Sequence, residues 1–139
     1  MAYAQALIGY APVPIRIWLG IILLVHGAQK VFILGPGKVA GYFGSLGLEP
    51  AYFLALLVIL VEFGGGICLL LGLLTRVVSL LFAVEMAVAI WKVHADKGFS
   101  VSQNPLGYEF PMLLIAGCLA LVLAGPGRFA VDRAVGIEK

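Results

Sequence analysis

Charged residues are scarce in this sequence. Asp, Glu, Lys and Arg make up 12% of the 139 residues, whereas hydrophobic residues make up 63%. A soluble domain usually carries about 25% charged and about 45–50% apolar residues. A soluble fold of this length still exposes roughly a third of its unfolded surface, so one core cannot hide this many apolar side chains. The composition therefore predicts an integral membrane protein whose apolar exterior faces lipid.

The marks of several other protein classes are missing or weak. The net charge is +2, and no run of Lys or Arg predicts a nucleic-acid partner. The two cysteines, Cys68 and Cys118, lie in apolar stretches without a CxxC spacing or a nearby His pair. We interpret them as small core residues rather than as a disulfide, a zinc site or a redox-active pair. No metal, haem, flavin or iron–sulfur motif is apparent, and no basic leader segment indicates a cleaved signal peptide.

Four apolar segments approach the roughly 20 residues that a spanning helix needs. Proline lies at or before the start of several segments, and the sequence Gly125-Pro126-Gly127 ends the last one. A tight turn at Thr75-Arg76 predicts an antiparallel helical hairpin, and residues 38–46 favour a short amphipathic interfacial helix. The expected fold class is an all-α, integral membrane four-helix bundle in a single domain, residues 1–139. The expected spans are residues 14–34, 51–74, 77–94 and 108–125.

Loop charges predict the orientation of the bundle. With four spans, both termini and the turn between the second and third spans lie on one side of the membrane. That side carries five of the nine basic residues, namely Arg16, Arg76, Arg128, Arg133 and Lys139. Because basic residues favour the cytoplasmic side, we expect the termini in the cytoplasm.

Several ionisable residues lie at membrane depth, where each costs a few kcal/mol and usually faces a bundle interior, a partner or a cavity. They are Arg16, His26, Lys30, Glu62, Glu85, Lys92, His94 and Glu109. Two simpler interpretations remain open: Arg16 and Lys30 can extend to the two interfaces, and Glu62 can be an interhelical tie. If the side chains converge, they form a polar pocket for a quinone head group, a small anion or a proton relay.

The spacing of these residues indicates which of them can meet. His26 and Lys30 are four residues apart and therefore share one helix face. A carboxylate as deep as Glu62 must be protonated or paired, and His26 and Lys30 are its candidate partners. Glu85 and Lys92, seven residues apart, also share a face. Aromatic residues near the span ends, such as Tyr108, fit an interfacial belt, with quinone stacking as the alternative.

The order of several short motifs resembles the DoxX family. The resemblance extends from about Pro14 to Asp132. The motifs are His26-Gly27-Ala28-Gln29-Lys30, Phe43-Gly44-Ser45-Leu46-Gly47-Leu48, Val61-Glu62-Phe63-Gly64-Gly65-Gly66, Leu74-Thr75-Arg76, His94 with Gly98-Phe99, Gly107-Tyr108-Glu109-Phe110-Pro111, and Gly125-Pro126-Gly127-Arg128 with Asp132. The resemblance implies a four-helix prokaryotic membrane protein, and the family includes membrane subunits of a thiosulfate:quinone oxidoreductase. Its matched positions make His26, Lys30, Glu62 and Glu109 candidate site residues.

Three functional hypotheses follow. The preferred one is a quinone-interacting inner-membrane subunit of an oxidoreductase system, in which a partner protein delivers electrons. Its candidate catalytic residues are His26, Glu62 and Glu109. Its candidate quinone-binding residues are Lys30, Glu85, Lys92, Tyr108 and His94. The alternatives are an anchor or assembly factor without catalysis, and a small-solute transporter that works as a homo-oligomer.

Overall fold

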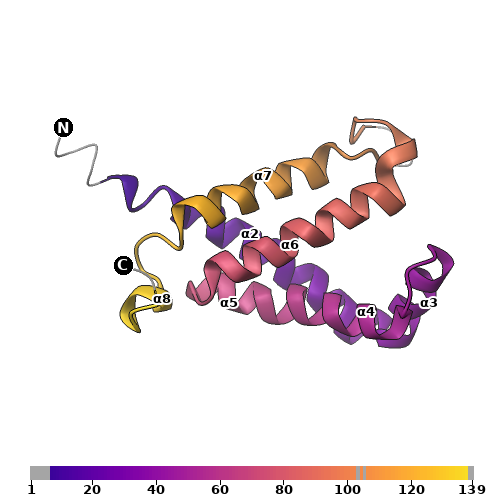
Figure 1. The fold of residues 1–139 in the computed structure, drawn as a ribbon, viewed down its shortest axis with the longest axis horizontal. Helices are drawn as coiled ribbons and strands as arrows, with labels where there is room; N and C mark the ends of the chain where they lie inside the picture. The colour runs from indigo at the N-terminus through magenta and orange to yellow at the C-terminus, as the bar shows by residue number, and fades with distance from the viewer. Residues whose placement is uncertain (1–6, 103, 105, 138–139) are drawn as a thin grey trace.

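The described part of the chain is helical. The computed structural model describes residues 7–102, 104 and 106–137, so Lys139 and residues 1–6, which entered the arguments on orientation and targeting, lie outside it. The elements, labelled as in Figure 1, are α2 (Pro12–Ala28), η1 (Gln29–Leu34), α3 (Pro36–Ser45), α4 (Ala51–Ile59), η2 (Leu60–Gly64), α5 (Gly65–Leu71), α6 (Thr75–Ala89), η3 (Ile90–His94), η4 (Ala95–Lys97), α7 (Glu109–Ala124) and α8 (Val131–Ala134). The segments η1, η2 and η3 are π-helical, and η4 is a 3-10 turn.

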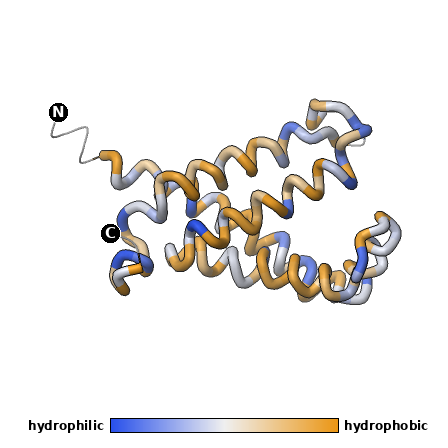
Figure 2. The backbone as a smooth tube through the Cα atoms, viewed as in Figure 1, coloured by the Kyte–Doolittle hydropathy of each residue, from blue (hydrophilic) through white to orange (hydrophobic). Residues whose placement is uncertain are grey.

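Three continuous helices are long and apolar enough to cross a bilayer. They comprise Pro12–Leu34, Ala51–Leu71 and Thr75–Lys97, with 23, 21 and 23 residues. No more than 33% of the most apolar stretch of any of them is buried inside the protein, so most of these side chains face outward. Figure 2 shows the apolar colour along the helices and the polar colour mainly at their ends. These three spans confirm the expected all-α membrane architecture.

The fourth expected span is shorter than predicted. Helix α7 is apolar but has 16 residues, which corresponds to roughly 24 Å at 1.5 Å per residue. The hydrocarbon core is about 30 Å thick. A full crossing by α7 therefore stays a prediction, as does the orientation of the bundle. The short helix expected over residues 38–46 is present as α3.

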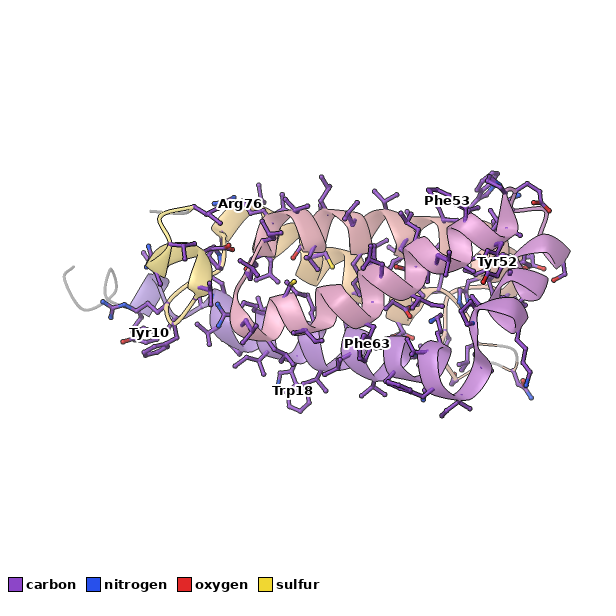
Figure 3. The ribbon with its side chains drawn as sticks, turned by 90° about the horizontal axis from the view of Figure 1, so that it is seen from below. Tyr10, Trp18, Tyr52, Phe53, Phe63 and Arg76 are labelled. Atoms are coloured by element: carbon purple, nitrogen blue, oxygen red, sulfur yellow. The ribbon has the colours of Figure 1, made fainter. Side chains whose placement is uncertain are left out.

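The helices pack tightly in one half of the molecule and diverge in the other. The α5–α6 turn lies at the same end as the termini, and from there the α6–α7 pair separates from α4 toward the α3 end (Figure 1). The buried core lies in the packed half and is built from α2, α5, α6 and α7. It comprises Leu19, Leu23, Leu69, Val78, Phe82, Ala83, Leu114, Cys118 and Leu121. Large side chains such as Trp18 and Phe53, 66% and 60% exposed, project from the outside (Figure 3).

Glycines bring α2 into backbone contact with the second span. A Cβ atom on Gly27 would lie 2.3 Å from the Phe63 nitrogen, and one on Gly66 would lie 2.6 Å from the Leu24 nitrogen. Since real Cβ atoms do not approach backbone this closely, only glycine permits this packing. Small residues at the contact are a common way to pack helices in membranes. The close approach fixes α2 against η2 and α5.

A buried carboxylate at the terminal end holds the α5–α6 turn. Asp132, 1% exposed, accepts hydrogen bonds from the backbone N–H groups of Leu74 at 2.7 Å and Thr75 at 3.0 Å. Its own N–H donates to the Gly72 carbonyl at 3.0 Å. The carboxylate therefore caps the amino end of α6, where a negative charge is favourable.

The Arg16 side chain lies inside the protein. Its position near the start of the first span had also allowed it to extend to the membrane interface. It is 2% exposed and donates to the carbonyls of Pro126 at 2.8 Å and Phe129 at 3.1 Å. These two carbonyls, which lie just after the last apolar helix, accept from the terminal nitrogens of the guanidinium, whereas its buried Nε has no partner among the described residues. Arg16 thus ties the start of the first span to the C-terminal segment.

We expect Asp132→Asn to lower the stability of the folded protein by about 2 kcal/mol. The change weakens two buried hydrogen bonds to a charged acceptor and removes the negative charge at the start of α6. Thermal unfolding in mild detergent would measure it. Asp96→Asn, in the exposed η4 turn, is the matched control and should have little effect. Equal melting temperatures for the two variants would contradict the capping role.

We also expect Gly66→Ala to destabilise the bundle by about 2 kcal/mol or more, because the added Cβ forces α2 and α5 apart. Gly41→Ala is the control, since nothing lies within 4 Å of a Cβ built at Gly41 in α3. It should be neutral or slightly stabilising, given the better helix propensity of alanine. Detergent unfolding curves for both variants check the prediction, and an unperturbed Gly66→Ala protein would contradict it.

Candidate functional site

A cavity of about 480 Å³ opens where the helices diverge. Its walls come from α2 and η1, from α3 and the loop after it, from α4 and η2, and from α6 and η3. Most of the wall is apolar, as with Leu54, Val58, Leu81 and Val88. Volumes of this order are typical of small-molecule sites, which combine apolar walls with a few polar groups.

Five ionisable side chains line the cavity, and all five were singled out from the sequence. They are His26, Lys30, Glu62, Glu85 and Lys92. At their centre the Lys30 Nζ lies 2.5 Å from the Glu62 Oε2, with side-chain exposures of 20% and 5%. Lys30 is therefore the partner that the depth of Glu62 required. His26, the other candidate partner of Glu62, also lines the cavity, but it is exposed.

Each of the three long helices has a π-helical segment that contributes one charged residue to the cavity, whereas Glu85 comes from the regular helix α6. Lys30 lies in η1, Glu62 in η2 and Lys92 in η3. A π-helical turn takes an extra residue into the helix and changes the direction of the side chains that follow. Such turns occur frequently at functional sites. The sequence analysis missed them, because a regular 3.6-residue pattern gives no sign of a local change in helix type.

Glu85 approaches the Lys30–Glu62 pair from α6, across the cavity. It lies next to the Glu62 carboxyl and within electrostatic range of Lys30. The Glu85 and Glu62 carboxyl groups lie within hydrogen-bonding distance of each other, and the Glu85 Oε2 atom is buried. Lys92, which lines the same cavity as the seven-residue spacing predicts, directs its Nζ over the Trp91 ring, 4.1 Å from the centroid.

The structure places the three remaining predicted site residues away from this cavity, in and beside the α6–α7 connection. The Glu109 Oε2 accepts a hydrogen bond from the Val101 N–H at 3.1 Å, and the Tyr108 ring packs edge-on against Phe99 at 5.6 Å. His94 donates from Nδ1 to the Leu106 carbonyl at 2.9 Å. The hydrogen bond and the ring contact hold the connection together, and a catalytic or binding role for these residues stays a prediction.

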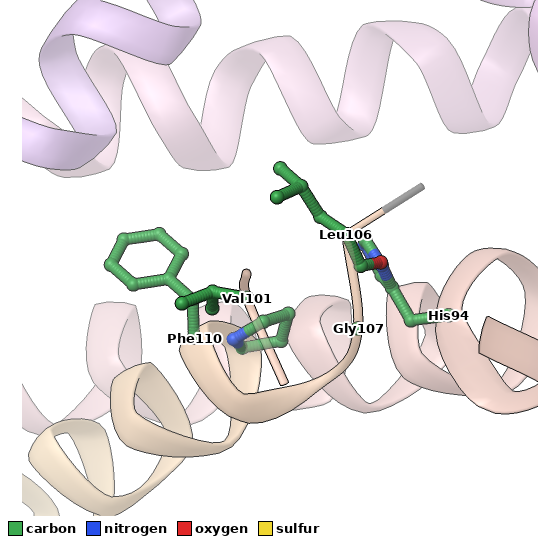
Figure 4. Close-up of a pocket in the computed structure, with 6 residues that line it drawn as sticks. His94, Val101, Leu106, Gly107 and Phe110 are labelled. Carbon is green, nitrogen blue, oxygen red and sulfur yellow. The ribbon is translucent and has the colours of Figure 1, made fainter. Parts of the chain in front are cut away.

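His94 lines a second, apolar cavity of about 320 Å³ beside this connection (Figure 4). Its other lining residues are Val101, Leu106, Gly107, Phe110 and Pro111. The imidazole is the ionisable group of this lining, and its Nδ1 is already bonded to backbone. This hollow thus has far less polar character than the larger one.

The sequence analysis also missed part of the cavity wall. Tyr42 and Phe43 of α3, with Leu46 and Leu48 after it, close the cavity on the side away from the termini. The amphipathic pattern of residues 38–46 predicted the helix but not its role as a wall. The two cysteines are free, and Cys118 lies in the core as expected.

The fold and the site define a polytopic helical membrane protein with a charged cluster at one end of a largely apolar cavity. The model of the DoxX family matches residues 11–95, more than half of the chain. The chain belongs to the DoxX family. Within the described part of the chain, every residue that lines the larger cavity, from His26 to Val93, lies in the matched stretch.

Curated relatives agree with this assignment. The inner membrane protein YqjF of Escherichia coli is 35% identical over 103 residues, which cover 71% of this chain and 78% of the relative. The uncharacterized membrane protein Rv3486 of Mycobacterium tuberculosis is 34% identical, covering 86% and 77%. The protein of Bacillus subtilis named putative oxidoreductase CatD is 34% identical, covering 85% and 81%. No solved structure matches the chain significantly.

We expect Lys30→Leu to destabilise the protein more than Glu62→Leu. Without Lys30, two neighbouring carboxyl groups lose their cation, whereas without Glu62 the Lys30 ammonium can pair with Glu85. Breaking a buried ion pair costs about 3 kcal/mol, while replacing both partners by apolar residues is often neutral. Unfolding in detergent of both single variants and of the double variant measures these terms. A double variant no more stable than Lys30→Leu would contradict the pairing.

Proposed function

We propose that this chain is a quinone-interacting membrane subunit of an oxidoreductase system and that it works with a partner protein in the prokaryotic inner membrane. The observation that carries the proposal is the cavity, which has apolar walls and a charged cluster at one end. A quinone has the matching division into a polar ring with two carbonyl oxygens and an apolar tail. The names of two relatives, an inner membrane protein and a putative oxidoreductase, support the same direction.

The residues present fit a quinone head group. Lys30 and His26 line the cavity and carry N–H donors for the ring carbonyls, and the carboxyl groups of Glu62 and Glu85 lie beside them. Leu54, Val58 and similar side chains offer apolar contact for a tail. A bound quinone would supply two-electron redox chemistry coupled to proton uptake. The chain's own residues would bind and orient the ring and hold protons beside it.

The partner follows from the absence of any recognisable electron carrier motif in the sequence. Electrons would have to reach the cavity from another protein, and the membrane location limits that partner to a neighbour in the bilayer or at its surface. Because the cavity lies in the diverging half, the proposal favours a partner that binds near α3 or the α6–α7 connection. The two alternative functions, an anchor and an oligomeric transporter, do not require a cavity that fits a quinone ring.

Filling the cavity tests the proposal. Ala89 lines it, whereas Ala87, on the same helix, is exposed and outside it. We expect Ala89→Phe to weaken binding of a decyl-tailed benzoquinone or naphthoquinone by about tenfold or more, because the added ring occupies the site. Ala87→Phe should bind like the unchanged protein. Calorimetric titration in nanodiscs measures the affinities.

A decyl chain without the ring serves as the ligand control and should not compete. Failure of both quinones to bind saturably would argue against the proposal. Flux of a solute through liposomes, abolished by Glu62→Gln, would favour the transporter instead. If the unchanged protein shows neither quinone binding nor solute flux and Glu62→Gln only lowers its stability, the anchor hypothesis is favoured.

A further inference from the structure

Three apolar residues of the larger cavity are also exposed on the outside of the helices. Leu57 of α4 and Leu81 and Val84 of α6 line the cavity and are 44%, 47% and 56% exposed. Other apolar wall residues of the same two helices, such as Leu54 and Val88, are half-buried. A side chain that lines a cavity and is this exposed lies at its edge. The cavity therefore opens between α4 and α6, where the α6–α7 pair separates from α4 (Figure 1).

This opening lies at the depth of the hydrocarbon rather than at the membrane surface. Leu57 follows Ala51, the first residue of its span, by six residues, and Leu81 follows Thr75, the first residue of the next span, by six. At 1.5 Å per residue, both lie roughly 9 Å inside the nearer end of the helix, and Val84 lies deeper. Lipid chains surround a spanning helix at this depth. The edge of the cavity between α4 and α6 therefore faces lipid rather than water.

A ligand with a long hydrocarbon tail needs such an opening. The cavity volume of about 480 Å³ is that of sites for molecules of roughly drug size. A ring and the first part of a tail fit within it, and the rest of a long tail has to leave the cavity. Passing that tail into water is unfavourable, because apolar surface is favoured where water is absent. An opening between α4 and α6 keeps the tail among lipid chains.

We propose that the opening between α4 and α6, bordered by Leu57, Leu81 and Val84, is a lateral entrance through which the ligand moves between the bilayer and the cavity. The inference rests on the proposed function and specifies its substrate class, a lipophilic ring whose tail stays in the hydrocarbon. The Glu62 side chain is only 5% exposed, so the charged cluster lies farther inside than this apolar edge. The ring therefore passes the apolar edge before it reaches the charged cluster.

A bulkier side chain at an entrance raises the barrier to passage without changing the free or the bound state. We therefore expect Leu57→Trp and Val84→Trp to slow both association and dissociation of the decyl-tailed benzoquinone about tenfold, with an unchanged dissociation constant. Stopped-flow quenching of tryptophan fluorescence in nanodiscs measures both rates. The matched controls are Leu56→Trp in α4 and Leu80→Trp in α6. These leucines are 44% and 52% exposed but do not line the cavity, so both variants should exchange ligand like the unchanged protein.

Equal rates for the edge variants and the control variants overturn the inference. So does a weaker affinity with an unchanged association rate, since the two side chains would then be walls of the site. If the tryptophan variants do not fold by their unfolding curves, Leu57→Ala and Val84→Ala widen the edge and should speed both rates, and unchanged rates overturn the inference. Faster exchange in Tyr42→Ala alone would place the entrance at the α3 end and also overturn it. Absence of binding by the unchanged protein rejects the proposed function itself and is distinct from these results.

Discussion

The ion pair between Lys30 and Glu62 sets the arrangement of the diverging half of this protein. Either charge alone would be strongly unfavourable in a medium without water, because nothing in hydrocarbon replaces its hydration. With an Nζ–Oε2 distance of 2.5 Å, each group satisfies the other. The pair also connects the end of the first span to the middle of the second, where glycine already allows backbone contact. Charge pairing and close packing therefore act on the same two helices.

In the terminal half, buried charged side chains are stabilised in a different way. Arg16 and Asp132 are both nearly inaccessible, and backbone groups bind both of them, although the Arg16 Nε has no partner among the described residues. Arg76 adds to this arrangement by donating to the Val122 and Leu123 carbonyls at the end of α7, where a cation is favourable. Polar residues hold the helices together at this end, beside the apolar core. At the other end the polar residues line a cavity, and that contrast supports the proposal that they form a binding site.

The sequence predicted the first three spans well because hydropathy and helix length are properties of a continuous stretch of chain. It also predicted that Lys30 is a partner for Glu62, since a deep carboxylate needs a cation and few were available. The sequence did not predict that Glu109, Tyr108 and His94 lie away from the cavity. The depth of a residue along a helix does not show in which direction the adjoining loop turns. The contacts of Arg16 and Asp132 were not predicted for a related reason. Their partners are backbone carbonyl and N–H groups of distant turns, which no side-chain pattern reveals.

The family match clarifies which part of the chain carries the site. It covers residues 11–95, and the cavity lining runs from His26 to Val93, so every wall belongs to the matched part. Helix α7 lies outside it and supports α6 from behind through core residues such as Leu114 and Cys118. The first three spans would then hold the ligand, while the last helix keeps α6 at the distance from α4 that leaves room for it. The position of α6 brings the Glu85 carboxyl next to the Lys30–Glu62 pair, so the third span completes the charged cluster of the cavity.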